Sequence, residues 1–222
     1  MTHKPLDGIR LDAQSGTTKS LVILIHGYGA NANDLIDLGR QWGPLFPDTA
    51  FVSVNAPERC PISPTGLQWF KLTHNPGGMR SAEEYWNGVC HSEEVLQAFI
   101  DSELEKHGLD ETKCVLVGFS QGTMMALHVG LRRKKQLAGI IAYSGVLAGS
   151  EKIDKSIKVK PPVLLVHGED DPVIPVEALS IAKQALRTID VDPEWHIVAD
   201  LGHGIDALGF QIGYNFMKRM LP

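Results

Sequence analysis

One short run constrains the fold of this 222-residue chain more than any other feature of its sequence. A Gly-x-Ser-x-Gly pattern at residues 118–122 follows an apolar, β-type stretch at residues 115–117 and leads directly into a helix-type segment. Only a very sharp turn fits between a strand that ends at Gly118 and a helix that starts near Gln121, and the flanking glycines leave room for it. The run predicts a strained Ser120 with its hydroxyl raised above the end of a sheet; a serine that merely caps the helix is the alternative.

Strand-type and helix-type patterns alternate along the rest of the chain. Such alternation implies parallel pairing, because a crossover helix must return the chain to the same end of the sheet. We expect an α/β fold with a mostly parallel central sheet flanked by helices, in a single domain over residues 1–222 and without a large cap domain. The expected strands are residues 21–26, 50–54, 115–119, 139–143, 163–167 and 195–198, and the main expected helices are about 33–42, 81–107, 121–131, 176–188 and 205–219.

Composition and charge exclude several classes of protein. The formal net charge of −5 is not that of a nucleic-acid-binding domain, and the basic run at residues 132–135 is placed to end the helix after Ser120. Three cysteines without metal-ligand spacing indicate a reducing compartment and no disulfide framework. The N-terminus has no apolar signal core and no stretch reaches membrane-spanning length, so we expect a cytoplasmic protein without stable membrane insertion.

A nucleophilic serine needs a base to take its proton and a carboxylate to orient that base. At this type of strand-to-helix turn, the acid and then the histidine follow the serine in the chain. His203 lies in a loop between Gly202 and Gly204, which predicts that it folds back towards Ser120, whereas His196 lies within a strand pattern. For the acid we favour Asp171, because Pro172 biases its backbone to an extended shape in a fixed loop. Asp200 is the rival acid.

The oxyanion of a tetrahedral intermediate requires preorganised backbone N–H donors. The residue after the serine, Gln121, supplies one at the positive end of its helix. The glycine-rich loop at residues 26–30, after an early strand, predicts the second donor at Tyr28. A phosphate-binding turn is the alternative for this loop, but it lacks the full Gly-x-Gly-x-x-Gly spacing and a P-loop lysine.

These motifs together resemble the phospholipase/carboxylesterase family of α/β-hydrolases, which includes the acyl-protein thioesterases. The resemblance rests on the segments at residues 26–29, 118–122, 167–175 and 202–203 and covers nearly the whole chain. It implies a Ser120–His203–Asp171 triad, no metal and no organic cofactor. It also implies hydrolysis of small-molecule or lipid-like acyl esters, from short- and medium-chain carboxylic esters to lysophospholipids and acyl thioesters. We expect a monomer or a homodimer.

The long loop at residues 55–80 carries Trp69 and Phe70, which resemble the aromatic pair beside the family's acyl pocket. The resemblance implies that both residues bind substrate, and no segment is long enough for a large lid, so we expect a shallow, open acyl site. Lys71 stands where the family usually has an acidic residue, and Tyr28 stands where a leucine is common. Both departures concern the preference for acyl chain and head group, not the hydrolytic step.

Two other functions fit the same fold. A peptidase could use the same triad, although 222 residues leave no room for an added propeller or large cap domain. A non-catalytic binding module is the other alternative, but such a protein is expected to lose a triad member, and all three are present. The sequence therefore favours a serine esterase or thioesterase.

Overall fold

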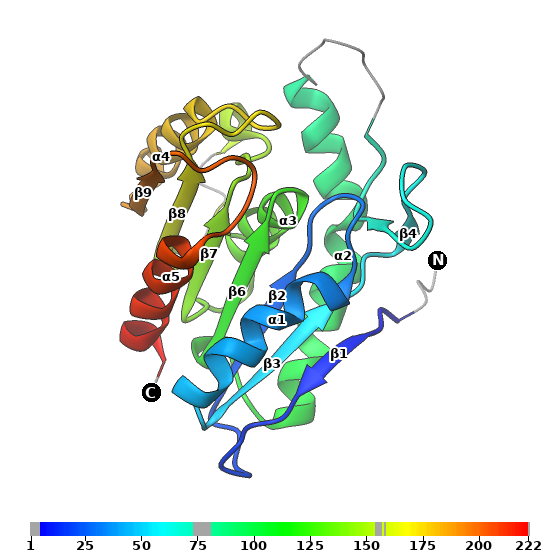
Figure 1. Cartoon of the computed structure of the whole chain (residues 1–222), viewed down its shortest axis with the longest axis vertical. Coiled ribbons are helices and arrows are strands. Elements are labelled where there is room, and N and C mark those ends of the chain that lie inside the picture. The colour runs from blue at the N-terminus through cyan, green and yellow to red at the C-terminus, as the bar shows by residue number, and fades with distance from the viewer. Residues whose placement is uncertain (1–4, 73–80, 154–156, 158, 222) are drawn as a thin grey trace.

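A seven-stranded sheet forms the centre of the molecule in the computed structural model (Figure 1), which describes residues 5–72, 81–153, 157 and 159–221. Its strands lie in the order β1-β3-β2-β6-β7-β8-β9, and every neighbouring pair is parallel except β1 with β3. The strands are β1 (Gly8–Leu11), β2 (Ser20–Ile25), β3 (Thr49–Val54), β6 (Cys114–Phe119), β7 (Gly139–Tyr143), β8 (Val163–Gly168) and β9 (Glu194–Val198).

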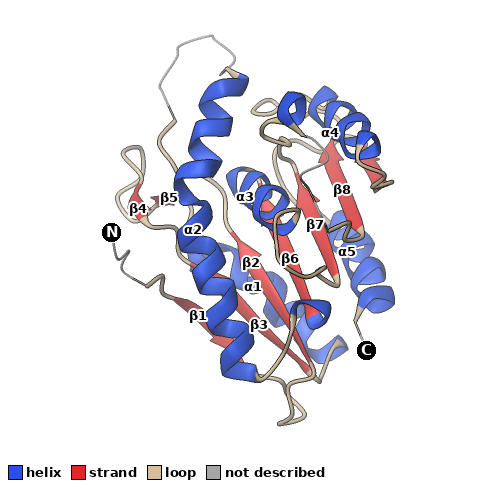
Figure 2. Cartoon of the chain, turned by 180° about the vertical axis from the view of Figure 1, so that it is seen from behind, coloured by secondary structure: helices blue, strands red, loops and turns tan. Residues whose placement is uncertain are grey.

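Helices cover both faces of this sheet. Helices α1 and α5 lie on the face seen in Figure 1, and α2, α3 and α4 lie on the face seen in Figure 2. The helices are α1 (Ala32–Trp42), α2 (Ala82–His107), α3 (Gln121–Gly130), α4 (Glu177–Thr188) and α5 (Ala207–Met220), with short 3-10 turns at Gly43–Leu45, Glu111–Lys113 and Ser150–Lys152. The mostly parallel sheet with helices on both faces confirms the expected α/β architecture.

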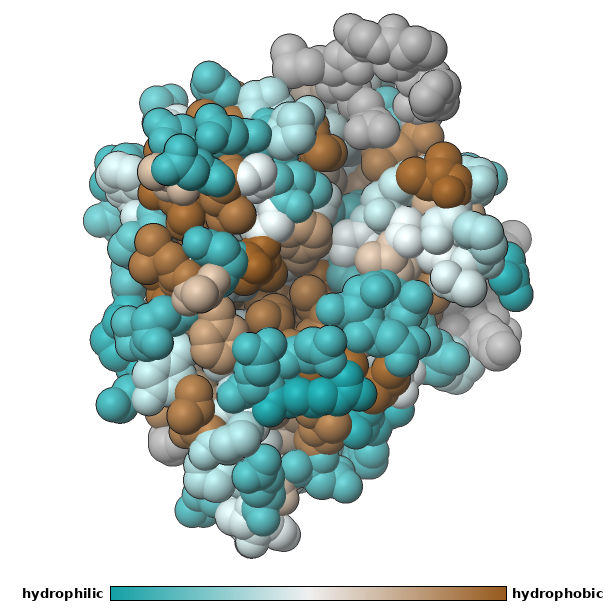
Figure 3. Space-filling view, viewed as in Figure 1, coloured by the Kyte–Doolittle hydropathy of each residue, from teal (hydrophilic) through white to brown (hydrophobic). Residues whose placement is uncertain are grey.

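The apolar runs become strands that are buried on both faces. In β2, Leu21, Ile23 and Ile25 pack in the core beneath α2, α3 and α4, whereas Val22 and Leu24 pack beneath α1 and α5. A strand between two helical layers has no solvated face, which explains why its sequence is continuously apolar rather than alternating. The exposed side of α1 is polar, and this helix shows as hydrophilic surface in Figure 3.

Two small elements were not predicted. Strand β1 adds an antiparallel edge to the sheet, and its four residues are too short to give a clear alternating pattern. Within the expected loop at residues 55–80, β4 (Glu58–Arg59) pairs with β5 (Leu67–Gln68) as a two-stranded sheet. Residues 73–80 of that loop lie outside the described part of the chain.

The parallel strands bring several loops to one end of the sheet. The loops after β2, β6, β8 and β9 all leave from carboxyl ends of strands, which is where open α/β sheets bind their ligands. Among the helices that the structure describes, none is both long enough and apolar enough to cross a membrane.

Candidate active site

Ser120 lies at the sharp turn between β6 and α3. Its φ of 56° and ψ of −116° are unusual for a residue with a side chain, and such strain is typical of a serine held at the top of an α/β-hydrolase sheet. Its backbone N–H donates to the Tyr143 carbonyl at 3.0 Å, which ties the turn to the neighbouring strand. The flanking glycines have no space for a side chain: a Cβ on Gly122 would lie 1.8 Å from the Ile25 carbonyl oxygen, and one on Gly118 would lie 2.5 Å from the Gly122 carbonyl oxygen.

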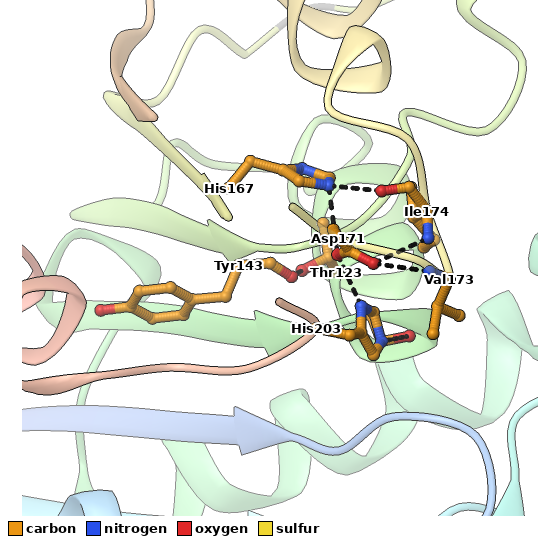
Figure 4. Close-up of polar contacts among 8 residues, drawn as sticks. Thr123, Tyr143, His167, Asp171, Val173, Ile174 and His203 are labelled. Carbon is orange, nitrogen blue, oxygen red and sulfur yellow. Dashed lines mark hydrogen bonds and ion pairs between the residues drawn. The ribbon is translucent and has the colours of Figure 1, made fainter. Parts of the chain in front are cut away.

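His203 reaches Ser120 from the loop between β9 and α5. Its Nε2 lies 3.0 Å from the Ser120 Oγ, and its Nδ1 lies 2.7 Å from Asp171 Oδ2 (Figure 4). Because a carboxylate only accepts hydrogen bonds, the proton of a neutral His203 is on Nδ1. Nε2 is then free to accept the hydroxyl proton of Ser120.

Asp171 is buried in the loop between β8 and α4. Its Oδ1 accepts backbone hydrogen bonds from Val173 at 2.8 Å and Ile174 at 2.9 Å. Burial alone would raise the pKa of this carboxyl, but the hydrogen bonds from His203, Ile174 and Val173 outweigh it and hold the pKa of Asp171 below its ordinary value. Asp171 is therefore a charged acceptor at neutral pH.

The rival residues lie elsewhere. His196 is exposed on β9, and Asp200 is exposed in the following turn with a φ of 56°. The structure thus brings Ser120, His203 and Asp171 together and leaves the two alternatives at the surface.

The loop that follows β2 packs directly on the Ser120 turn. A Cβ on Gly27 would lie 3.1 Å from the Ser120 Cβ, a contact tighter than most, and Tyr28 is the next residue. Gln121 is the first residue of α3, where a backbone N–H has no acceptor within the helix. Both residues predicted to hold an oxyanion are therefore on segments that border Ser120.

A buried histidine fixes that loop. His26 Nε2 accepts the Ala56 N–H at 3.0 Å, so its Nδ1 carries the proton and donates to the Gly27 carbonyl at 2.8 Å. Burial lowers the pKa of His26, which keeps the ring neutral and this pattern of donors intact. The sequence showed His26 only as the first residue of a glycine-rich loop.

The packing of Trp69 and Phe70 does not support the prediction that their side chains wall an open acyl site. The two side chains are only 0% and 2% exposed and belong to the hydrophobic core, since aromatic rings of this size gain most from full burial. Their backbone groups instead form hydrogen bonds with the side chain of Gln121. Its Oε1 accepts from the Trp69 N–H and its Nε2 donates to the Phe70 carbonyl, both at 2.9 Å. Trp69 Nε1 also donates to the His26 carbonyl at 2.9 Å.

Two contacts of the site were not foreseen from the sequence. One is the side chain of Gln121, which links the start of α3 to the segment after β5. The other is His167, whose Nε2 lies 3.3 Å from Asp171 Oδ2. Its position four residues before Asp171, at the end of an apolar strand, was the available signal. Among the described residues no group of three or more histidine, cysteine or carboxylate side chains could hold a metal ion.

Comparison with known proteins identifies the family. The family model described as Phospholipase/Carboxylesterase matches residues 7–221. The chain belongs to the phospholipase/carboxylesterase family. It is 29% identical over 208 residues to Esterase YpfH of Escherichia coli strain K12, covering 92% of this chain and 84% of that protein. It is also 29% identical over 196 residues to Acyl-protein thioesterase 1 of Saccharomyces cerevisiae, covering 81% of this chain and 82% of that protein.

Solved structures of the family show the same fold. A crystal structure of esterase PE8 superposes with a TM-score of 0.94 at 41% sequence identity, covering 98% of this chain and all of that one. The Bacillus cereus carboxylesterase superposes with a TM-score of 0.74 at 16% identity, which is a likeness of fold. The predicted family is confirmed, and this member of the phospholipase/carboxylesterase family is an enzyme of the esterase and thioesterase type.

Proposed function

We propose that this esterase works through a Ser120–His203–Asp171 triad and a covalent acyl-enzyme. The observation that carries the proposal is the continuous chain of contacts from Ser120 Oγ to His203 Nε2 at 3.0 Å and from His203 Nδ1 to Asp171 Oδ2 at 2.7 Å. A serine, a base in hydrogen-bond reach and a carboxylate that orients the base are the parts that activate a hydroxyl nucleophile.

In the first half of the reaction, the Ser120 oxygen attacks the carbonyl carbon of the ester while its proton passes to His203 Nε2. The negative charge that forms on the carbonyl oxygen is met by the backbone N–H groups of Gln121 and Tyr28. His203 then gives its proton to the leaving alcohol or thiol, the bond to that group breaks, and the acyl group remains on Ser120.

Water completes the cycle. His203 takes a proton from a water molecule, whose oxygen attacks the acyl carbonyl and forms a second tetrahedral intermediate. Its collapse returns the proton to Ser120 and releases the carboxylic acid. Asp171 stays ionised throughout and stabilises the protonated imidazole in both halves.

We propose short- and medium-chain carboxylic esters as substrates, with lysophospholipids and acyl thioesters as further candidates. The relatives named esterase and acyl-protein thioesterase support both kinds of acyl bond. Ile62 and Val173 are exposed apolar side chains near the site: Ile62 packs near Gly29 of the loop after β2, and Val173 binds Asp171 through its backbone. They offer an apolar surface to an acyl chain, in place of the buried Trp69 and Phe70.

A substrate panel tests this proposal. We expect turnover of p-nitrophenyl esters from acetate to octanoate, measurable turnover of a lysophospholipid or an acyl thioester, and poor hydrolysis of emulsified long-chain triglycerides without activation at a lipid–water interface. His203→Ala should lower kcat on the order of 10³-fold or more, and adding Ser120→Ala should cost little further because the triad acts as a unit. Independent, multiplying losses, or strong cleavage of peptides with no cleavage of esters, would contradict the proposal.

A further inference from the structure

His167 is a buried histidine beside the triad that the mechanism above does not use. It lies in β8, one residue before the strand ends, and its side chain is 2% exposed. Histidine is rarely placed in a core without a set of fixed partners, because its ring nitrogens must be satisfied there. Its partners therefore indicate what it does.

The hydrogen on His167 is fixed by geometry. Its Nε2 lies 2.9 Å from the Ile174 carbonyl oxygen, which can only accept, so Nε2 carries a proton. The same nitrogen lies 3.3 Å from Asp171 Oδ2, the oxygen that also accepts from His203 Nδ1 (Figure 4). The His167 ring therefore lies against the Asp171 carboxylate while its Nε2–H donates to the Ile174 carbonyl.

These contacts close a small ring around the acid. Ile174 donates its N–H to Asp171 Oδ1 and accepts from His167 through its carbonyl, so the peptide groups on both sides of Ile174 are held. The turn that carries Asp171 is thus hydrogen-bonded to β8 through the His167 side chain. The other ionisable side chains of this turn, Glu169 and Asp170, are exposed.

We propose that His167 is a positioning residue for the reaction, an inference that rests on the proposed triad. It holds the Asp171 turn in register with His203 through its hydrogen bond to the Ile174 carbonyl. This supports kcat, because orientation of the acid sets the orientation of the base.

The test compares three variants by kcat and KM, because loss of positioning lowers kcat and leaves KM nearly unchanged. His167→Leu removes the donor, and His167→Gln keeps an N–H donor at a similar reach. His196→Leu is the matched control, because His196 is an exposed histidine on the adjacent strand, paired in register with Val166. Hydrolysis of p-nitrophenyl butyrate gives kcat and KM, and fluorophosphonate labelling reports the reactivity of Ser120.

We expect H167L to lower kcat about tenfold or more with KM within about twofold, as outer partners of a functional group do. H167Q should recover most of kcat, and H196L should match the wild type. An unchanged kcat in H167L would overturn the proposal, and so would equal losses of kcat in H167L and H167Q.

H167Q keeps the test decisive if H167L does not fold, because a tenfold loss in folded H167Q would contradict a role that one N–H donor fulfils. The two proposals also fail separately. A wild-type enzyme whose Ser120 is not labelled refutes the triad itself. Labelling of the wild type with an identical labelling rate in H167L refutes only the role of His167.

Discussion

The hydrogen bonds that surround Asp171 control the charge of its carboxylate. Both carboxylate oxygens accept hydrogen bonds, Oδ1 from two backbone N–H groups and Oδ2 from His203. These bonds lower the pKa of Asp171 against the opposing effect of burial. The acid therefore remains ionised to a lower pH than a free aspartate, so Asp171 does not limit activity in mildly acidic solution.

The choice of acid can be tested directly. Asp171→Asn should lower kcat on the order of 10⁴-fold, because the amide favours the wrong tautomer of the base. Asp200→Asn is the control, since Asp200 is exposed in the adjacent turn and should keep kcat within a few-fold of the wild type. Steady-state kinetics on p-nitrophenyl butyrate measures both. If the Asp200 variant were crippled and the Asp171 variant active, the assignment of the acid would be wrong.

Trp69 should matter for stability before it matters for substrate size. Its side chain is fully buried and its indole N–H binds the His26 carbonyl, so Trp69→Ala should cost about 3–5 kcal/mol of unfolding free energy. Trp195→Ala is the matched control, because Trp195 is 44% exposed on β9, and it should cost much less. Urea unfolding measures both values. Equal costs, or a selective rise in KM for octanoate esters at unchanged stability, would contradict this assignment of Trp69 to the core.

At the scale of elements, the turn between β6 and α3 works because α3 lies directly against β2. The Gly122 backbone approaches the end of β2 so closely that any Cβ would collide with the Ile25 carbonyl group. This contact brings the loop after β2, with Tyr28, to the same side of Ser120 as the start of α3. The geometry of the two proposed oxyanion donors therefore depends on the packing of a helix on a strand.

Gly122→Ala tests this packing. A Cβ at 1.8 Å from a backbone oxygen forces the two elements apart, so we expect a loss of about 3 kcal/mol or more, with loss of activity. Gly43→Ala is the control, because its Cβ would meet only the end of the Gln14 side chain at 3.5 Å, and its stability should change by less than about 1 kcal/mol. Similar melting temperatures for the two variants would contradict the close approach of α3 to β2.

At the scale of the whole molecule, two buried histidines link folding to pH. Burial lowers the pKa of His26 and of His128, and for His128 the neighbouring Arg132 lowers it further. Both rings are neutral in the folded protein, whereas the unfolded chain takes up protons as the pH falls through about 6.5. The unfolded state therefore binds more protons below this pH, and the folded state loses stability.

We expect the free energy of unfolding to decrease as the pH falls from about 6.5 to about 5, by up to about 1.4 kcal/mol per pH unit for each proton taken up. His128→Gln should reduce this slope, and His91→Gln should leave it unchanged, because the His91 side chain is 62% exposed. Denaturant unfolding at a series of pH values gives the slopes. A flat profile in the wild type, or a slope that His128→Gln does not change, would contradict the linkage.

The sequence predicted the structure correctly where the type of a residue and its position in the pattern both required the same local structure. Continuous apolar runs required strands buried on both faces, and the glycines around Ser120 required a sharp turn, so the sheet and the elbow could be predicted. Strand β1 and the β4–β5 pair could not, because strands of four and two residues leave no periodic signal.

The side-chain contacts of the site were harder to predict because they join distant segments. Residues 69 and 121 meet through a backbone-to-side-chain pair across 52 positions, and nothing in local sequence specifies it. From sequence alone, an aromatic pair in a loop is equally compatible with the wall of a pocket and with the hydrophobic core. Only the packing of that loop against α2 and β2 decides between the two.

The identity of the nucleophile is the central claim, and trapping it covalently tests that claim most directly. The enzyme is treated with a fluorophosphonate, its intact mass is measured, and the modified peptide is sequenced by mass spectrometry. The triad predicts one phosphonyl group per chain, on Ser120, with loss of ester hydrolysis in proportion to labelling and no label on folded Ser120→Ala. A label on another residue, or a folded Ser120→Ala protein that hydrolyses esters at a near-normal rate, would contradict the mechanism.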